Sequence, residues 1–523
     1  MEFFETAVSA LLGFMAATVF ILYWFSTSTF HYWKNKGVKS LKPSPLFGNI
    51  KHFVLCKLSP SEVFQDLYNK FDGERYGGIH LARKPVLLIR DPELMKHILL
   101  KDFAYFPGKG NHPDLKKDPL SYNLFNLEGE KWKYIRTKLT PAFTPGKLKI
   151  VYQHIDHYSE KLIEHLEEHA KNKDIIDMYN ILVNFTMDAT GSCAFGVEAN
   201  AMDDEDSAFK KMGHRIIHAN GSTYIDILES IFPILPRFFR ISTFPRDVTT
   251  FFQMVIKKIM EYREQNHIMK KDVMHLLMLA RNKTADDSNN EDTQECLQTG
   301  NEKSSNIRDE GFNEAVLTAQ AAMFLRAGSE KASTAMSFCL NELALQPALQ
   351  SELRAEIEAA KEEHSGKLTY ETVLGLKLLD RVVSETLRKY PLEASIFRVC
   401  KKPYNIPGTS VQLDKGTRVL IPVYALHHDP KYYPEPERFD PDRFTDINKS
   451  SRQQFTYLPF GEGPRVCIGF RYGMLQVKVG LAALLLHYEF SACHKTKACP
   501  ELNTRTWITS PASGMWLRIH ERK

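Results

Sequence analysis

The residues with the clearest chemistry lie in one short segment, Phe460–Gly469, which reads Phe-Gly-Glu-Gly-Pro-Arg-Val-Cys-Ile-Gly. Its cysteine, Cys467, stands among glycines and two residues after Arg465. A lone thiolate in such a loop can be the axial ligand of a haem iron, and glycines let the backbone turn closely around it. The arginine can donate to a haem propionate. The competing interpretation is a Gly/Pro-rich turn that buries an ordinary cysteine.

Composition narrows the class of protein. The chain has 523 residues, of which 43% are hydrophobic and 25% charged, and this is typical of a globular enzyme with a large core. A net charge of +5 is too mild for this length to indicate binding to nucleic acid. The 8 cysteines form no Cys-x-x-Cys pairs, which favours free thiols in a reducing compartment.

The N-terminus predicts a membrane anchor. No Lys, Arg, Asp or Glu occurs from Thr6 to Trp33, and the run is long enough to cross a bilayer and has no clear cleavage site after it. Lysines follow it, so the positive-inside tendency places the remaining chain in the cytosol. The alternative is a buried core helix. We therefore expect a transmembrane signal anchor (1–30), a basic, proline-rich and extended hinge (31–50), and a catalytic domain (51–523).

The elements that must position Cys467 are mostly helical. Apolar residues over Glu314–Leu345 and over Phe470–Leu485 predict helices, and the dipole of the second helix favours a thiolate at its N-terminus. Short apolar stretches at 81–90 and 396–398 predict strands. The expected fold class is therefore mainly α with small β-sheets.

Two connecting regions have less regular patterns. The polar residues 281–310 lack an apolar period and predict a mobile surface loop. Residues 225–252 mix aromatic, aliphatic and basic side chains, which suits either a loop at the membrane surface or a partly buried helix–loop–helix.

Two pairs of residues have the spacing of a shared helix face. Trp132 and Arg136 are four residues apart, and Glu385 and Arg388 are three apart. An arginine stays charged, as a partner of a propionate must. The alternative for Trp132 and Arg136 is a surface arginine beside a core tryptophan. The alternative for Glu385 and Arg388 is a solvated ion pair.

In this order along the chain, the motifs resemble those of the cytochromes P450. The cysteine segment matches every fixed position of the family's Phe-x-x-Gly-x-Arg-x-Cys-x-Gly signature. The anchor, proline hinge, Trp-x-x-x-Arg, long helix, Glu-x-x-Arg, Pro-Asp-Arg-Phe and cysteine loop extend the resemblance over nearly the whole chain. The residues at 438–441 and 457–465 resemble most the insect detoxification branch of the microsomal enzymes.

The resemblance implies haem b (iron protoporphyrin IX) as the cofactor, with Cys467 as the axial ligand of its iron. It implies that four further residues bind the cofactor: Trp132, Arg136, Arg398 and Arg465. It also implies a structural trio made of Glu385, Arg388 and Arg443, the last from a Pro-Asp-Arg-Phe segment where the family has Pro-Glu-Arg-Phe.

The implied activity is that of a monooxygenase, which inserts one oxygen atom of O₂ into lipophilic substrates such as xenobiotics, insecticides, plant toxins or endogenous lipids. NADPH would act indirectly, through NADPH–cytochrome P450 reductase, and cytochrome b5 is an additional candidate partner. With the anchor, the resemblance implies a single-pass protein of the endoplasmic reticulum membrane that faces the cytosol. Basic residues near the cysteine are candidates for docking the reductase: Lys131, Lys133, Lys138 and Arg471.

The chain departs from the family pattern on the helix Glu314–Leu345. The family usually reads Ala/Gly-Gly-x-Asp/Glu-Thr there, whereas this chain keeps the acid, Glu330, and has Lys331 in place of the threonine. A hydroxyl donates and accepts hydrogen bonds, but an ammonium only donates and is costly to bury. Thr334, one turn further on, could substitute through a water. Glu330, Lys331 and Thr334 are the candidate catalytic residues.

The effect of this departure depends on where the side chains point. Arg326 is four residues before Glu330 and could pair with it, which would hold the acid ionised. If Lys331 points into solvent channels, turnover survives; if not, oxygen activation is poorly coupled or lost. Two alternatives to the monooxygenase therefore stay open: a haem-thiolate isomerase or dehydratase that needs no reductase, and a haem- or ligand-binding protein without turnover.

Overall fold

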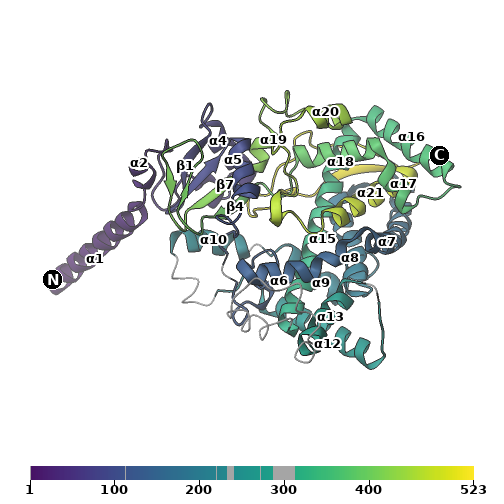
Figure 1. The fold of residues 1–523 in the computed structure, drawn as a ribbon, viewed down its shortest axis with the longest axis horizontal. Helices are drawn as coiled ribbons and strands as arrows, with labels where there is room; N and C mark the ends of the chain where they lie inside the picture. Colours follow the sequence, from purple (N-terminus) through teal and green to yellow (C-terminus); the bar gives the residue numbers. More distant parts are fainter. Residues whose placement is uncertain are drawn as a thin grey trace.

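The computed structural model describes residues 2–111, 113–219, 221–232, 241–270, 272–286 and 313–522. A large helical lobe lies beside a smaller lobe that carries the main sheet, and helix α1 projects from the smaller lobe (Figure 1). The prediction of a mainly α fold with small sheets is confirmed.

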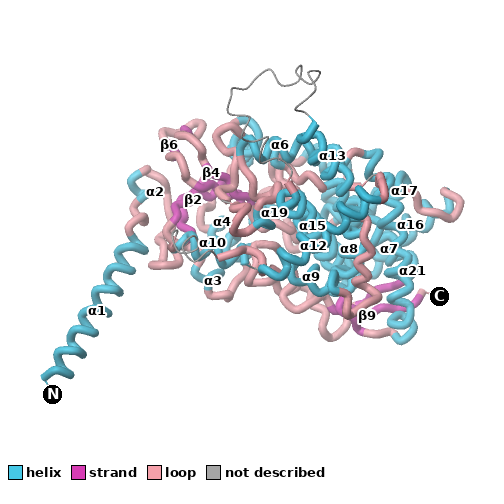
Figure 2. The backbone as a smooth tube through the Cα atoms, turned by 90° about the horizontal axis from the view of Figure 1, so that it is seen from below, coloured by secondary structure: helices cyan, strands magenta, loops and turns pink. Residues whose placement is uncertain are grey.

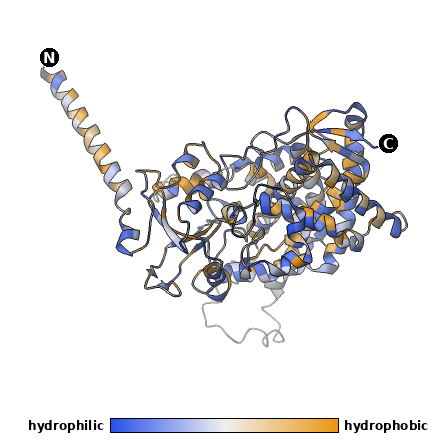
Figure 3. Ribbon diagram, turned by 90° about the horizontal axis from the view of Figure 1, so that it is seen from above, coloured by the Kyte–Doolittle hydropathy of each residue, from blue (hydrophilic) through white to orange (hydrophobic). Residues whose placement is uncertain are grey.

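Helix α1, Glu2–Thr27, is built from the charge-poor N-terminal run. It stands away from the body of the protein and is apolar along its length (Figure 3). The most apolar stretch of the helical span Phe3–Asn35 is fully exposed, and the span is long and apolar enough to cross a membrane. An apolar surface of this size would be unfavourable in water, which suits the helix to membrane anchoring.

The proline-rich segment after α1 differs from our expectation of an extended spacer. Trp33, in helix α2 (Tyr32–Asn35), is fully buried and donates its indole N–H to the Ile79 carbonyl at 2.9 Å. Further on, Gly48 pairs with Leu81. The free energy gained by burying Trp33 outweighs the tendency of the prolines to keep the segment extended. The segment therefore packs against the main sheet.

The main sheet has four strands in the order β1 (Tyr76–Leu81), β2 (Lys84–Ile89), β7 (Arg418–Ile421) and β4 (Ile396–Val399). Only β2 and β7 are parallel. The predicted stretch 81–90 thus spans a hairpin turn, where Ala82 takes a positive φ of 52°. The smaller sheets contain β3 (Ile175–Asp177), β9 (Trp516–Glu521) and β8 (Tyr488–Ser491), and then β5 (Tyr404–Asn405) and β6 (Gln412–Leu413). Figure 2 shows that β9 and the main sheet lie at opposite ends of the molecule.

The core of the helical lobe is built around α15, which spans Glu314–Leu345 as predicted. It packs against α8 (Met178–Phe195) and α21 (Phe470–His487), and most of its residues are buried because neighbours cover it on several sides. Gly480 of α21 allows this close approach, since a Cβ there would lie 2.6 Å from the sulfur of Met336.

The other helices surround this core. They are α3 (Lys51–Val54), α4 (Pro60–Asn69), α5 (Pro92–Lys96), α6 (Gly129–Leu139), α7 (Pro145–Asn172), α9 (Ala208–Ile217), α10 (Gly221–Ile231), α12 (Arg246–Gln265), α13 (Val273–Asp286), α16 (Pro347–Glu363), α17 (Tyr370–Gly375), α18 (Lys377–Lys389), α19 (Val423–His427) and α20 (Asp446–Ser451), with short π or 3₁₀ turns η1 (His97–Lys101), η2 (Pro119–Ser121), η3 (Thr140–Phe143), η6 (Pro441–Phe444) and η7 (Gly463–Arg465).

The two irregular regions are resolved in part. The predicted loop 281–310 begins as helix, because α13 continues to Asp286, and its residues 287–310 lie outside the described part of the chain. In the region 225–252, α10 and α12 flank residues 233–240, which also lie outside it.

Candidate active site

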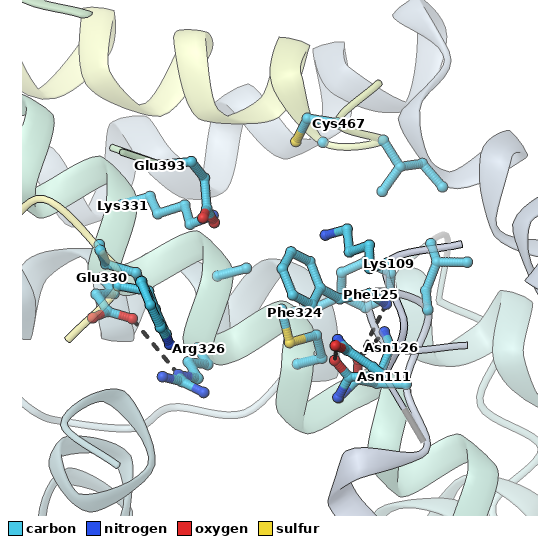
Figure 4. A pocket seen from close by; sticks show the side chains of 18 of the residues that line it. Lys109, Asn111, Phe125, Asn126, Phe324, Arg326, Glu330, Lys331, Glu393 and Cys467 are labelled. Carbon is cyan, nitrogen blue, oxygen red and sulfur yellow. Dashed lines mark hydrogen bonds and ion pairs between the residues drawn. The ribbon is translucent and has the colours of Figure 1, made fainter. Parts of the chain in front are cut away.

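A cavity of about 1190 Å³ lies between α15 and the cysteine loop. Its walls include Cys467, residues of α6 and α15, and strand β4. Figure 4 shows the Cys467 side chain on one side of the cavity, with Phe324 and the charged residues of α15 on the other. Phe324, Phe397 and Trp507 contribute aromatic surface to the lining, so that much of the cavity suits apolar molecules.

Local backbone geometry explains how the cysteine reaches the cavity. Gly463 takes a φ of +76°, and a Cβ there would lie only 2.0 Å from the Leu99 carbonyl oxygen, so the position requires glycine. The Cys467 N–H donates to the Phe460 carbonyl at 2.9 Å. Helix α21 begins three residues after the cysteine, at Phe470. The loop therefore presents the sulfur beside a helix N-terminus, where a thiolate is stabilised.

The predicted cofactor-binding residues Trp132, Arg136 and Arg465 meet on one wall. The Arg465 guanidinium lies 4.3 Å from the centroid of the Trp132 ring and donates to the carbonyls of Pro107 (2.6 Å) and Leu127 (2.8 Å). Arg136 also lines the cavity. Burial lowers the pKa of Arg136 and lowers that of Arg465 to about 10. An anionic ligand beside Arg136 and Arg465 would stabilise their charged forms.

Arg398 on β4 has the clearest need for such a ligand. Its side chain is buried, with 3% of the residue exposed, and its Nε–H has no hydrogen-bond partner among the described residues. One terminal N–H donates to the Phe397 carbonyl at 2.8 Å. Burial, together with the nearby Arg465, lowers the pKa of Arg398 to about 9. A buried N–H without an acceptor is rare in a native structure, and a haem propionate would supply the missing acceptor. The residues present therefore fit a haem.

Lys109 belongs to the same wall, and our sequence reasoning missed it. Its ammonium group lies 2.9 Å from the centroid of the Phe125 ring (Figure 4), and burial lowers its pKa well below the ordinary value. The neighbouring Gly108 pairs with Val399, which brings this loop to strand β4. The only sign in the sequence was a lysine between two glycines.

The predicted trio forms behind the cysteine loop. Arg388 is fully buried and donates twice to the Glu385 carboxylate, at 2.8 and 2.9 Å. Arg443 lies 3.5 Å from the same carboxylate, which also accepts the Asp440 N–H at 2.9 Å. Burial raises the pKa of Glu385, and Arg388 opposes that rise. The trio joins α18 to η6 and does not line the cavity.

His427 connects this trio to the cysteine segment. The Leu458 N–H donates to its Nε2 at 2.9 Å, so that its Nδ1–H faces the Arg388 carbonyl oxygen at 3.2 Å. Burial lowers the pKa of His427 well below the ordinary value, and the neutral ring can therefore serve both bonds. A sequence with two adjacent histidines gives no indication of this role.

The candidate catalytic residues on α15 separate into two environments. Glu330 and Lys331 line the cavity. Thr334 is fully buried outside the lining, and its hydroxyl donates to the Glu330 carbonyl at 2.6 Å. The helix therefore turns this hydroxyl towards its own backbone.

The predicted pairing of Arg326 with Glu330 is confirmed, with 3.6 Å between Nε and Oε2. The consequence predicted for this pairing, an ionised acid, is opposed by burial. Burial raises the pKa of Glu330, although Arg326 and Lys331 oppose that rise. Removing the carboxylate from water raises its pKa by more than the guanidinium at this distance lowers it.

Of the two orientations considered for Lys331, the structure shows a side chain that lines the cavity. Its ammonium group is hydrogen-bonded to the carboxylate of Glu393 within the cavity (Figure 4). Glu393, which follows α18, was not among the candidates because an isolated glutamate after a helix has no distinctive spacing. This half-buried ion pair is the main feature of the site that the sequence did not reveal.

A thiol beside a helix N-terminus, arginines for which the described residues provide no ion pair, and a large cavity between them define a haem-thiolate protein. The cytochrome P450 family model matches residues 38–518, and the chain belongs to this family. It is a haem monooxygenase, an oxidoreductase with an N-terminal apolar helix suited to membrane anchoring.

Similar proteins are insect enzymes. Cytochrome P450 6k1 of Blattella germanica is 37% identical over 97% of this chain and 96% of its own length. Cytochrome P450 9e2 of the same species is 34% identical over 96% of both chains. Cytochrome P450 6a2 of Drosophila melanogaster is 34% identical over 97% of this chain and 99% of its own. This agrees with the resemblance to the insect branch.

Proposed function

We propose that this enzyme oxidises lipophilic xenobiotics, including insecticides and plant toxins, or endogenous lipids, with electrons that NADPH–cytochrome P450 reductase delivers. The observation that carries the proposal is the placement of Cys467 across a cavity of about 1190 Å³ whose lining includes several aromatic side chains. Such a cavity favours apolar molecules through the area that they remove from water.

In this proposal Cys467 is the axial ligand of the haem iron, and Trp132, Arg136, Arg398 and Arg465 hold the haem propionates. When bound, the haem supplies the oxygen-activating chemistry. Glu330 and Lys331 act from the wall formed by α15, where they place a carboxyl group and an ammonium donor in the cavity. The trio of Glu385, Arg388 and Arg443 keeps the protein behind the cysteine loop rigid.

We place the enzyme in the endoplasmic reticulum membrane, anchored by α1 with the catalytic domain in the cytosol. The lysines after the anchor support this orientation. The reductase would approach the side of the cysteine loop, where Lys133 of α6 and Arg471 of α21 are exposed and can attract an acidic surface. Cytochrome b5 would use the same side.

Two other functions have a specific observation in their favour, the absence of threonine at position 331. One is a peroxide isomerase or dehydratase, and the other is a protein that binds haem without turnover. The test compares them directly. Membranes that contain the protein and reductase receive a lipophilic probe with either NADPH or an organic hydroperoxide, and the Cys467→Ala variant is the control.

The monooxygenase requires product that depends on NADPH and disappears in Cys467→Ala. Rearranged peroxide without NADPH would establish the isomerase instead. A normal reduced carbon monoxide spectrum without product from either oxidant would leave only the binding protein.

A further inference from the structure

The wall of the cavity formed by α15 carries a charge pair, Lys331 and Glu393. Lys331 comes from the middle of α15, and Glu393 comes from the segment between α18 and β4. Their side chains keep 27% and 32% of their surface accessible, and both line the cavity. The pair therefore faces the space in which substrate and oxygen would meet.

Glu393 is held in place by its own backbone. It forms an isolated antiparallel bridge with Ile508, whose neighbour Trp507 is also part of the cavity wall. The carboxylate thus extends from a fixed point towards α15. A flexible lysine that meets a fixed acid loses most of its rotamers, so that its ammonium group occupies one position.

The surrounding charges keep both partners ionised. Burial alone would lower the pKa of Lys331, but the Glu393 carboxylate raises it above the ordinary value, and Cys467 and Glu330 add to this. Burial alone would raise the pKa of Glu393, but Lys331 and Lys109 hold it below the ordinary value, with a smaller contribution from Arg326. The directions agree, because each partner stabilises the charged form of the other.

Together, Lys331 and Glu393 have the hydrogen-bonding capacity that a threonine hydroxyl at position 331 would provide. A threonine hydroxyl both donates and accepts at one atom. Lys331 can only donate, but one of its three N–H groups meets Glu393 and the others remain for the cavity. The Glu393 carboxylate has further lone pairs and can accept from a water. Donor and acceptor are therefore present together, on two residues instead of one.

We propose that Lys331 and Glu393 form one donor–acceptor unit that takes the place of the missing threonine, with Glu393 as the positioning residue that fixes the Lys331 ammonium at the cavity wall. This inference rests on the proposed monooxygenase and identifies the groups that would hold water beside the substrate.

The test compares Glu393→Gln, the double variant Lys331→Thr/Glu393→Gln and a matched control. The control is Glu342→Gln, because Glu342 of α15 forms another buried ion pair, with Lys389 at 2.8 Å, outside the cavity lining. Product formed per NADPH consumed should fall in Glu393→Gln and return to at least the parent ratio in the double variant. Glu342→Gln should keep the parent ratio.

A second measurement does not depend on turnover. Haem-loaded protein is treated with acetic anhydride at several pH values, and acetylation of Lys331 relative to Lys389 is measured by mass spectrometry. Loss of the carboxylate should lower the pKa of Lys331 and raise its relative acetylation by about tenfold for each pKa unit lost. Unchanged acetylation of Lys331 or an unchanged product ratio in Glu393→Gln, or an equal fall of the product ratio in Glu342→Gln, would overturn the proposal.

The two proposals fail separately. Increased acetylation in Glu393→Gln without NADPH-dependent product from any variant, the double variant included, would remove the monooxygenase but keep the ion pair. Product with unchanged acetylation would remove the donor–acceptor unit and keep the monooxygenase.

Discussion

Replacing Arg398 with methionine should change the stability of the haem-free and haem-loaded protein in opposite directions. Arg398 is buried, has no carboxylate partner among the described residues and leaves its Nε–H without an acceptor. Burial lowers its pKa to about 9, and at about 1.36 kcal/mol for each pKa unit this is a cost of several kcal/mol against the charged form. Since an arginine stays charged in proteins, the haem-free protein carries this cost.

Methionine fills similar space without a charge, so the haem-free variant should unfold at higher urea concentration, by up to about 5 kcal/mol in the free energy of unfolding. The haem-loaded variant loses a charge-assisted hydrogen bond worth about 1.5–3 kcal/mol. Haem transfer to an excess of a haem-scavenging globin should therefore be about 10- to 150-fold faster. Both quantities are measurable on one preparation, with and without haem.

A matched control separates this effect from general loss of packing. Arg354 of α16 donates to the carbonyls of Leu485 (3.1 Å) and Tyr488 (3.4 Å), away from the cavity. Arg354→Met should destabilise both forms and leave the rate of haem transfer unchanged. A haem-free Arg398→Met protein that is less stable than the parent, or that releases haem at the parent rate, would refute the assignment of Arg398 to a propionate.

Three shorter predictions follow from other parts of the structure. Glu385→Gln leaves Arg388 buried without its charge partner and should lower the free energy of unfolding by about 3–5 kcal/mol, whereas Glu435→Gln, in an exposed pair, should change it by less than about 1 kcal/mol in chemical denaturation. Because burial raises the pKa of Glu330 above 4.5, stability should fall as pH rises through the window above 4.5, and Glu330→Gln should remove this slope in urea titrations at successive pH values. Removal of residues 1–30 should shift the protein from the membrane pellet to the supernatant in sedimentation, and a truncated protein that stays wholly in the pellet would contradict the role of α1 as the anchor.

Much of the fold could be predicted because its patterns are local. The bounds of α15 follow from one apolar run that starts after Asn313, whose side chain caps the helix, and ends before Pro347. The spacing of Trp132 and Arg136 on α6 likewise depends on a single helix. The packing of the proline-rich segment was missed because it depends on where Trp33 finds a partner, and that partner, Ile79, belongs to a strand elsewhere in the chain.

The same distinction explains what could not be foreseen in the site. A substitution at one position of a helix, such as Lys331, is visible in the sequence, but its compensation lies 62 residues further on, in a segment that only the fold brings to the cavity. Considered alone, a lysine ammonium in the cavity wall argues for an inactive enzyme, because partial burial disfavours the charge. With Glu393 beside it, the charge is stabilised and an acceptor is restored. The departure from the family pattern is therefore a two-residue change, and its effect on activity has to be judged for both residues together.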